Sequence, residues 1–116
     1  MPSPKESAVI EMQEYSYELG SYQGRTYHLR VRESSNSTGG STFATVVYYR
    51  DADARETEVI ARVDDAHGYS HFDRLYRRDQ QKDRVDWGPW EAADHFFERW
   101  RQYAERYEDA WGDSSN

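Results

Sequence analysis

The chain has 116 residues, which suits one small domain with a single modest core. It contains no cysteine, so disulfides, cysteine-based zinc sites and a thiol nucleophile are excluded. Acidic residues outnumber basic ones by 22 to 15, which gives a net charge of −7, and lysine is rare among the cations. A surface of this kind stays soluble at high salt, where screening weakens the repulsion among carboxylates, and we therefore predict a halophilic source.

Alternation of apolar and polar residues predicts four or five antiparallel strands before residue 80. In the second of them, Tyr27, Leu29 and Val31 alternate with His28 and Arg30, as expected of a strand with one buried face. A loop rich in Ser, Asn and Gly follows at residues 34–41. The predicted strands cover residues 11–19, 25–33, 42–50, 57–64 and 69–76.

Gly88 and Pro89 predict the start of a long helix, because proline is favoured in the first helical turn. Apolar residues then recur at spacings of three and four up to about residue 108, which indicates one buried stripe. This stripe consists of Trp90, Ala93, Phe96, Phe97, Trp100, Tyr103, Ala104 and Tyr107. We therefore expect an α+β fold, in which an antiparallel sheet of four or five strands carries one long C-terminal helix packed across one face.

The predicted domain organisation is simple. A single α+β domain is expected over residues 11–109, with flexible tails at residues 1–10 and 110–116, and no internal repeat indicates a second domain. The sequence shows neither an apolar run of transmembrane length nor the apolar core of a signal peptide. These features predict a cytoplasmic protein without membrane contact.

The candidate site lies at the turn between the last two predicted strands, residues 65–68. A chain reversal there would place Asp64 opposite His71, where the carboxylate would orient the imidazole for proton transfer. RNA cleavage without a metal needs a base for the 2′-hydroxyl proton, an acid for the leaving oxygen, and cations that hold phosphate. The residues predicted for catalysis are His67, His71, Asp64 and Tyr76, and those predicted for phosphate binding are Arg62, Arg74 and Arg77. No cofactor is expected.

Two alternatives remain open for these residues. They could be ordinary turn residues with satisfied hydrogen bonds. Two histidines with one or two aspartates could also bind Zn²⁺ or Mn²⁺. Their spacing matches no standard metal-site signature, so no residue is assigned as a metal ligand.

Two further patterns bear on possible partners. Five cations and two acids between residues 74 and 85 form a basic strip, which suggests an anionic partner such as RNA or an acidic protein. The alternative is a solvated loop whose arginines pair with nearby carboxylates. A set of rings could stack on bases, although their helical spacing favours a place in the core. This set comprises Trp87, Trp90, Phe96, Phe97 and Trp100.

The turn sequence and the order of elements resemble the small TumE-like toxins of toxin–antitoxin pairs. The matching residues are Arg62, Asp64, Asp65, His67, Gly68 and His71, and the order of elements matches from about residue 27 to residue 100. Asp65, Val63 and Asp73 depart from the family pattern, which has an asparagine, an aromatic residue and often a histidine in their places. The resemblance implies a toxin-like protein that acts on RNA and has an antitoxin partner.

The sequence therefore supports two hypotheses from different classes. The first is a toxin-like, metal-independent ribonuclease that an antitoxin neutralises. The second is a non-catalytic protein- or nucleic-acid-binding module whose sheet edge or basic strip docks its partner. Convergence of His67 and His71 beside a cleft would favour the first hypothesis, whereas scattered histidines and an exposed patch would favour the second.

Overall fold

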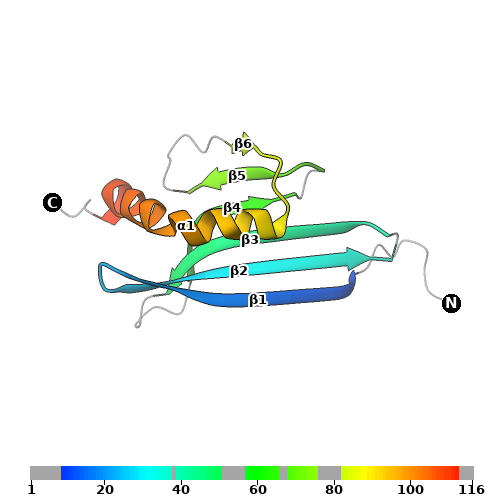
Figure 1. Cartoon of the computed structure of the whole chain (residues 1–116), viewed down its shortest axis with the longest axis horizontal. Coiled ribbons are helices and arrows are strands. Elements are labelled where there is room, and N and C mark those ends of the chain that lie inside the picture. Colours follow the sequence, from blue (N-terminus) through cyan, green and yellow to red (C-terminus); the bar gives the residue numbers. More distant parts are fainter. Residues whose placement is uncertain (1–8, 38, 51–56, 66–67, 76–81, 113–116) are drawn as a thin grey trace.

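The protein is one antiparallel sheet with a helix laid across it (Figure 1). A computed structural model describes residues 9–37, 39–50, 57–65, 68–75 and 82–112. The strands are β1 (Val9–Tyr22), β2 (Arg25–Asn36), β3 (Ser41–Arg50), β4 (Thr57–Asp64), β5 (His71–Arg74) and β6 (Lys82–Arg84). They are followed by α1 (Pro89–Tyr107) and a π-helical turn, η1 (Glu108–Gly112). The strands lie side by side in chain order, and every neighbouring pair is antiparallel.

The predicted α+β architecture is confirmed, with six strands where four or five were expected. The additional strand is β6, which pairs with β5. Its three polar residues carry no alternation of apolar and polar side chains, so pairing alone reveals it. The predicted tails lie partly outside the described residues, at 1–8 and 113–116; β1 already begins at Val9, and η1 extends to Gly112.

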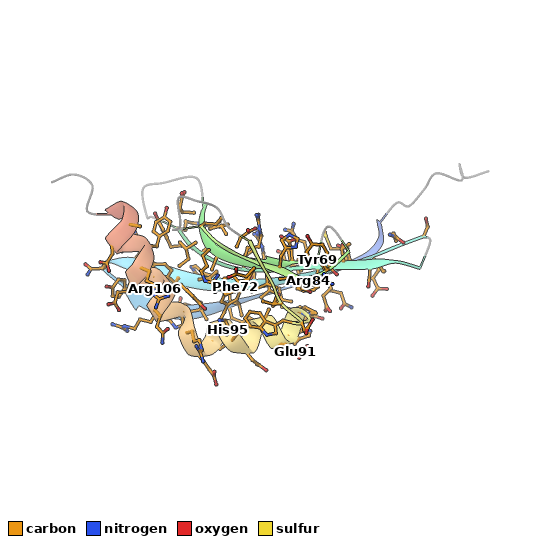
Figure 2. All side chains as sticks on the ribbon, turned by 90° about the horizontal axis from the view of Figure 1, so that it is seen from above. Tyr69, Phe72, Arg84, Glu91, His95 and Arg106 are labelled. Atoms are coloured by element: carbon orange, nitrogen blue, oxygen red, sulfur yellow. The ribbon has the colours of Figure 1, made fainter. Side chains whose placement is uncertain are left out.

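The core lies between the sheet and α1, which covers only one face (Figure 2). Successive residues of a strand point to opposite faces, and the odd-numbered residues of β2 and β3 point to the helix. Tyr27, Leu29 and Val47 on this face are completely buried, as is Phe96 of α1. The ring of Phe72 packs edge-on against Phe96, with 5.7 Å between ring centroids. This packing of sheet against helix buries four of the eight residues of the predicted apolar stripe and partly buries Trp100 and Tyr107, whereas Trp90 and Phe97 stay exposed.

The start of α1 is held in two ways. The backbone N–H of Gly88 donates a 2.9 Å hydrogen bond to the Glu91 side chain, which satisfies a group at the open end of the helix. The buried hydroxyl of Thr45 in β3 donates to the carbonyl of Pro89 at 3.0 Å. The helix therefore begins where the sequence predicts, and its first turn is attached to the middle of the sheet.

The opposite side of the sheet, which we call the helix-free face, carries the even-numbered side chains of β2 and β3 and, beyond a register shift in the β3–β4 pair, Arg62 and Asp64 of β4. Strand register aligns one row of residues across five strands on this face. The row consists of Arg32, Ala44, Asp64, His71 and Arg84. Among the described residues, no helix is long and apolar enough to cross a membrane.

Candidate functional site

The hairpin of β4 and β5 brings the two central candidates together. Asp64 and His71 are register partners, and Nε2 of His71 lies 3.3 Å from Oδ1 of Asp64. The turn between them is closed by a 3.0 Å hydrogen bond from the N–H of Gly68 to the carbonyl of Asp65. The predicted contact across the hairpin is therefore present. His67 lies outside the described residues, so its convergence with His71 stays a prediction.

Arg62 joins this pair to another carboxylate. Its guanidinium lies 3.1 Å from Oδ2 of Asp64 through Nε, which is an ion-pair distance without hydrogen-bond alignment. It also donates a 3.1 Å hydrogen bond to Oδ2 of Asp73, its register partner on β5. Arg62, Asp64, His71 and Asp73 thus form one connected group on the helix-free face, which we call the β4–β5 polar cluster.

Two members of the β4–β5 polar cluster are buried, whereas the side chain of Arg62 stays 38% exposed. His71 is 3% exposed and Asp73 is 4% exposed. Both ring nitrogens of His71 face oxygen atoms, since Nδ1 lies 3.2 Å from the carbonyl of Tyr69 and Nε2 faces Asp64. A general acid or base must reach the proton that it transfers, directly or through one water. In this arrangement the imidazole is occupied by structural contacts, which are what a satisfied buried histidine requires.

Arg74 is not part of this cluster. It follows Phe72 by two positions on β5 and therefore shares the helix-side face of the sheet. Its guanidinium lies 4.2 Å from the centroid of the Phe72 ring and forms an ion pair with Asp83. The structure therefore does not bring Arg62 and Arg74 to one phosphate site. Arg62 pairs with Asp73, so the next residue, Arg74, points to the opposite face of the sheet. Tyr76 and Arg77 lie outside the described residues.

The basic strip is divided in the same way. Of its members with described side chains, Arg74 pairs with Asp83 on the helix side. Arg84 lies on the other face, with its guanidinium 4.7 Å from the centroid of the exposed Tyr69 ring. Arg78 and its neighbours up to residue 81 lie outside the described residues. For Arg74, the alternative reading, an arginine paired with a nearby carboxylate, is the one that the structure supports.

No group of three or more His, Asp or Glu side chains suited to a metal ion occurs in the described ranges. In the β4–β5 polar cluster, the space between the two carboxylates already holds the guanidinium of Arg62. A cation bound there would meet this positive charge, so the cluster fits an internal ion-pair network better than a metal site.

A depression with about 360 Å³ of space adjoins the cluster on the helix-free face. Ala44 contributes only a methyl group at its floor, and Arg32 and Arg62 stand on either side. Both arginines are already paired, Arg32 with Glu14 at 2.6 Å and Arg62 with the cluster carboxylates. His71 does not line this depression. An entering anion would have to compete with these carboxylates, so the depression is a weak phosphate site.

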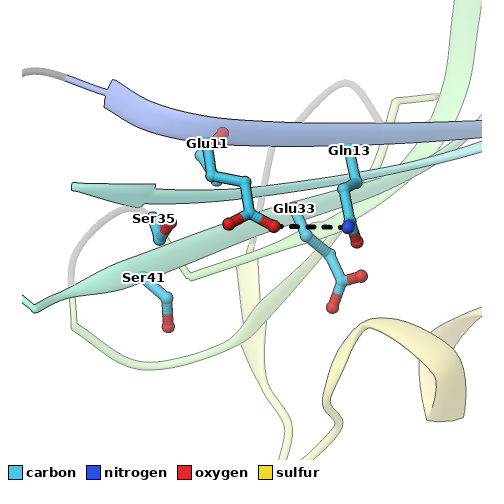
Figure 3. A pocket seen from close by; sticks show the side chains of 6 residues that line it. Glu11, Gln13, Glu33, Ser35 and Ser41 are labelled. Carbon is cyan, nitrogen blue, oxygen red and sulfur yellow. Dashed lines mark hydrogen bonds between the residues drawn. The ribbon is translucent and has the colours of Figure 1, made fainter.

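A smaller hollow is formed by side chains of β1, β2 and β3 (Figure 3). It has about 160 Å³ of space and is lined by Glu11, Gln13, Glu33, Ser34, Ser35 and Ser41. Glu11 accepts a hydrogen bond from Gln13 at 3.3 Å, and both residues are exposed. These groups are solvated polar side chains on a sheet surface, and their arrangement selects no ligand.

The outer edge of the sheet carries a feature that the sequence pattern missed. Tyr15 of β1 packs edge-on against Trp90 of α1, with 5.3 Å between ring centroids, and Tyr17 packs in the same way against Phe97 at 5.5 Å. These four rings, which we call the aromatic ridge, keep between 38% and 42% of their surface exposed. Helical spacing placed Trp90 and Phe97 in the core, but β1 is an edge strand of the sheet and covers them incompletely.

His95 was also missed, because one histidine within a helical stripe has no distinguishing spacing. Its ring lies 4.5 Å from Trp87 and 5.8 Å from Phe72, centroid to centroid, at the border of the core (Figure 2). Burial lowers the pKa of His95 from the ordinary value of 6.5, and the positive charges of Arg99 and Arg74 lower it further. The neutral imidazole is therefore the form that belongs to the packed structure.

This shift predicts a pH-dependent stability. Because the folded pKa of His95 lies below 6.5, the unfolded chain binds a proton there more readily than the folded chain. The contribution of His95 to the free energy of unfolding is complete above the pKa of the unfolded chain and is lost as the pH falls below that value. We expect the free energy of unfolding to decrease more steeply between about pH 7 and pH 5 in the parent than in His95→Gln, which cannot titrate. Parallel slopes in denaturant titrations would contradict this.

The fold and these surfaces define a small α+β protein, a six-stranded meander backed by one helix. The chain belongs to the family described as Domain of unknown function (DUF7718), which matches residues 10–113. No curated protein and no solved structure matches it. The similarity to TumE-like toxins therefore stays a prediction from the turn residues.

Proposed function

We propose that this domain is a non-catalytic protein-binding module that receives an extended segment of its partner along the outer edge of β1. The observation that carries the proposal is the aromatic ridge, four half-exposed rings beside the edge strand. Aromatic side chains with large exposed surface are typical anchors of protein interfaces. Their position beside a strand edge matches recognition by strand addition, in which backbone hydrogen bonds give affinity and side-chain contacts give specificity.

The two edges of the sheet differ in what they offer. β1 has 14 residues and pairs with β2 on one side, and no described strand pairs with its other side. β6, at the opposite edge, has only three residues. An edge strand presents unpaired N–H and C=O groups, and a long one can pair with an added strand over its length. The length of β1 and the ridge beside it therefore favour this edge.

The β4–β5 polar cluster supports a binding module more than an enzyme. His71 and Asp73 are buried, and their polar atoms are engaged within the sheet. An active site requires a reacting group that substrate can approach. The cluster instead joins β4 to β5 through charged side chains, which suits a structural role.

Strand addition can be tested with a peptide of about eight residues that alternates valine and threonine, an ordinary strand length. We expect the peptide to slow hydrogen exchange of the β1 amides and leave β5 unchanged. Trp90→Ser should weaken binding about tenfold, the effect of losing an interface anchor worth about 1.4 kcal/mol. Tyr69→Ser is the matched control, because Tyr69 is 45% exposed but lies next to β5 and β6, far from β1 in the strand order. Unchanged β1 exchange at saturating peptide would refute the proposal.

A ribonuclease that an antitoxin neutralises is the second candidate function, and the Asp64–His71 contact of 3.3 Å favours it. In this candidate, local opening of the hairpin would expose the imidazole to RNA. If this candidate holds, the purified protein cleaves RNA and His71→Ala abolishes cleavage while the fold persists. His28→Ala is the control, because His28 stacks on Tyr48 away from the hairpin. Equal cleavage by parent and His71→Ala would exclude this candidate.

We also propose a halophilic, cytoplasmic setting, and the charge of the chain supports the halophilic part of this proposal. With a net charge of −7, surplus carboxylates repel one another, and salt screens that repulsion within about 10 Å at 0.1 M and about 3 Å at 1 M. The melting temperature should therefore rise when KCl increases from low to molar concentration. A melting temperature independent of salt would remove the halophilic part of the proposal.

A further inference from the structure

We infer that the segment bound by β1 alternates apolar and cationic side chains, with the apolar ones toward the aromatic ridge and the cationic ones toward the helix-free face. This inference rests on the proposed function and adds the chemistry of the partner. It follows from the two faces of β1 over residues 14–18, which carry aromatic rings on one face and carboxylates on the other.

On the helix side, an added strand would meet rings. Tyr15 and Tyr17 lie opposite Val31 and Leu29 of β2 and point to this side, where Trp90 and Phe97 continue the surface. A neighbouring strand places its side chains about 5 Å from those of β1. Valine, leucine or aromatic side chains at alternate positions would therefore cover surface that is now exposed to water.

On the helix-free face, the same strand would meet carboxylates. Glu14 and Glu18 lie opposite Arg32 and His28 of β2 and point to this side. Both glutamates are exposed. Arg32 partly neutralises Glu14 through bonds of 2.6 and 2.9 Å, whereas Glu18 has no ion pair among the described residues. Lysine or arginine at the intervening positions of the partner would complement this charge.

The same carboxylates disfavour a second copy of the chain as the occupant. Antiparallel pairing of two β1 strands would bring Glu14 and Glu18 of both copies to the same face of the joined sheets. Each copy also carries a net charge of −7. Charged side chains on an edge strand are a known protection against self-pairing. An edge that repels its own copy and attracts cations selects a different, positively charged partner.

The test compares three peptides of about eight residues by fluorescence anisotropy at low salt, with valine alternating with lysine, threonine or glutamate. A fourth peptide has the same valine and lysine content as the alternating lysine peptide, with the valines in one block and the lysines in another. We expect the alternating lysine peptide to bind tightest, the glutamate peptide weakest, and the block peptide more weakly than the alternating one. Hydrogen exchange should show protection of β1.

Charge reversal on the protein assigns the effect to β1. Glu18→Lys should weaken the alternating lysine peptide about twofold to fivefold and strengthen the glutamate peptide, as expected for one exposed charge pair. Glu105→Lys is the matched control, because Glu105 is an exposed residue of α1 outside the ridge and its reversal changes the net charge equally. It should leave both affinities within error of the parent.

The outcomes separate the two proposals. Equal binding of all three alternating peptides, with β1 protected, would overturn this inference and leave the binding function standing. Equal effects of Glu18→Lys and Glu105→Lys would also overturn it, since only the net charge would then matter. Failure of every peptide to protect β1 would overturn both proposals. Sedimentation of the free protein as a dimer with β1 already protected would show that a second copy occupies the edge.

Discussion

Replacing Phe72 by alanine should lower the free energy of unfolding by about 3–5 kcal/mol, the range typical of a buried aromatic side chain. Phe72 is 1% exposed and connects β5 to the helix. Its ring packs edge-on against Phe96 and Tyr103, at 5.7 and 5.6 Å between centroids, and lies tilted against Trp87 at 5.8 Å. Alanine would leave a cavity that these rigid rings cannot fill by a small rotation, so both transfer energy and packing contacts are lost.

Phe97→Ala provides the matched control for Phe72→Ala. The chemical change is the same, but Phe97 is 42% exposed and packs mainly against Tyr17. Its loss should cost about 1 kcal/mol, the ordinary cost of a partly exposed position. Equilibrium unfolding in urea measures both values. If the two variants unfold at the same urea concentration, α1 is not docked on β5 as described.

Replacing Gly20 by alanine should be the second severe change, at about 2–4 kcal/mol, because two penalties combine there. Gly20 has φ +153°, a conformation that residues with a side chain rarely adopt. It also lies where a β-bulge in β1 brings the backbone against Trp100. A Cβ atom at this position would lie 2.9 Å from Cζ2 of Trp100, so the indole ring or the strand must move.

Two comparisons separate these penalties. Gly24→Ala introduces the same side chain at φ +79° with no atom within 4 Å, so it reports backbone strain alone, about 1 kcal/mol. In a Trp100→Ala background, Gly20→Ala should lose the part of its cost that comes from the indole ring and keep the backbone strain of φ +153°. A double-mutant cycle by thermal unfolding measures the coupling. If Gly20→Ala costs no more than Gly24→Ala in the parent, the close approach of Trp100 has no energetic consequence.

Several features of the protein follow from the sequence alone because they depend on neighbours along the chain. Alternation in residues 25–33 determines which side chains face the core, since the strand period of two residues is a property of the backbone, whereas residues 42–50 are apolar on both faces and indicate a central strand. Gly88 and Pro89 determine where α1 begins. The predicted meeting of Asp64 with His71 is confirmed, with residues 65–70 between them, although a four-residue turn at 65–68 would by itself pair Asp64 with Tyr69. The same alternation places Arg74 on the face opposite to Arg62, because Arg62 pairs with Asp73 and Arg74 is the next residue. The site prediction overlooked this.

Other features were decided only by the tertiary structure. His71 is 3% exposed, with Asp64 and the Tyr69 carbonyl at its ring nitrogens, and this exposure cannot be read from the residues of one turn. The aromatic ridge exists because β1 is the edge of the sheet and leaves Trp90 and Phe97 half covered, although their helical spacing equals that of buried Phe96. Local pattern specifies the direction of a side chain, whereas burial depends on which elements lie opposite it. Strand order and helix placement decide which elements lie opposite each other, and both depend on contacts between residues far apart in the chain.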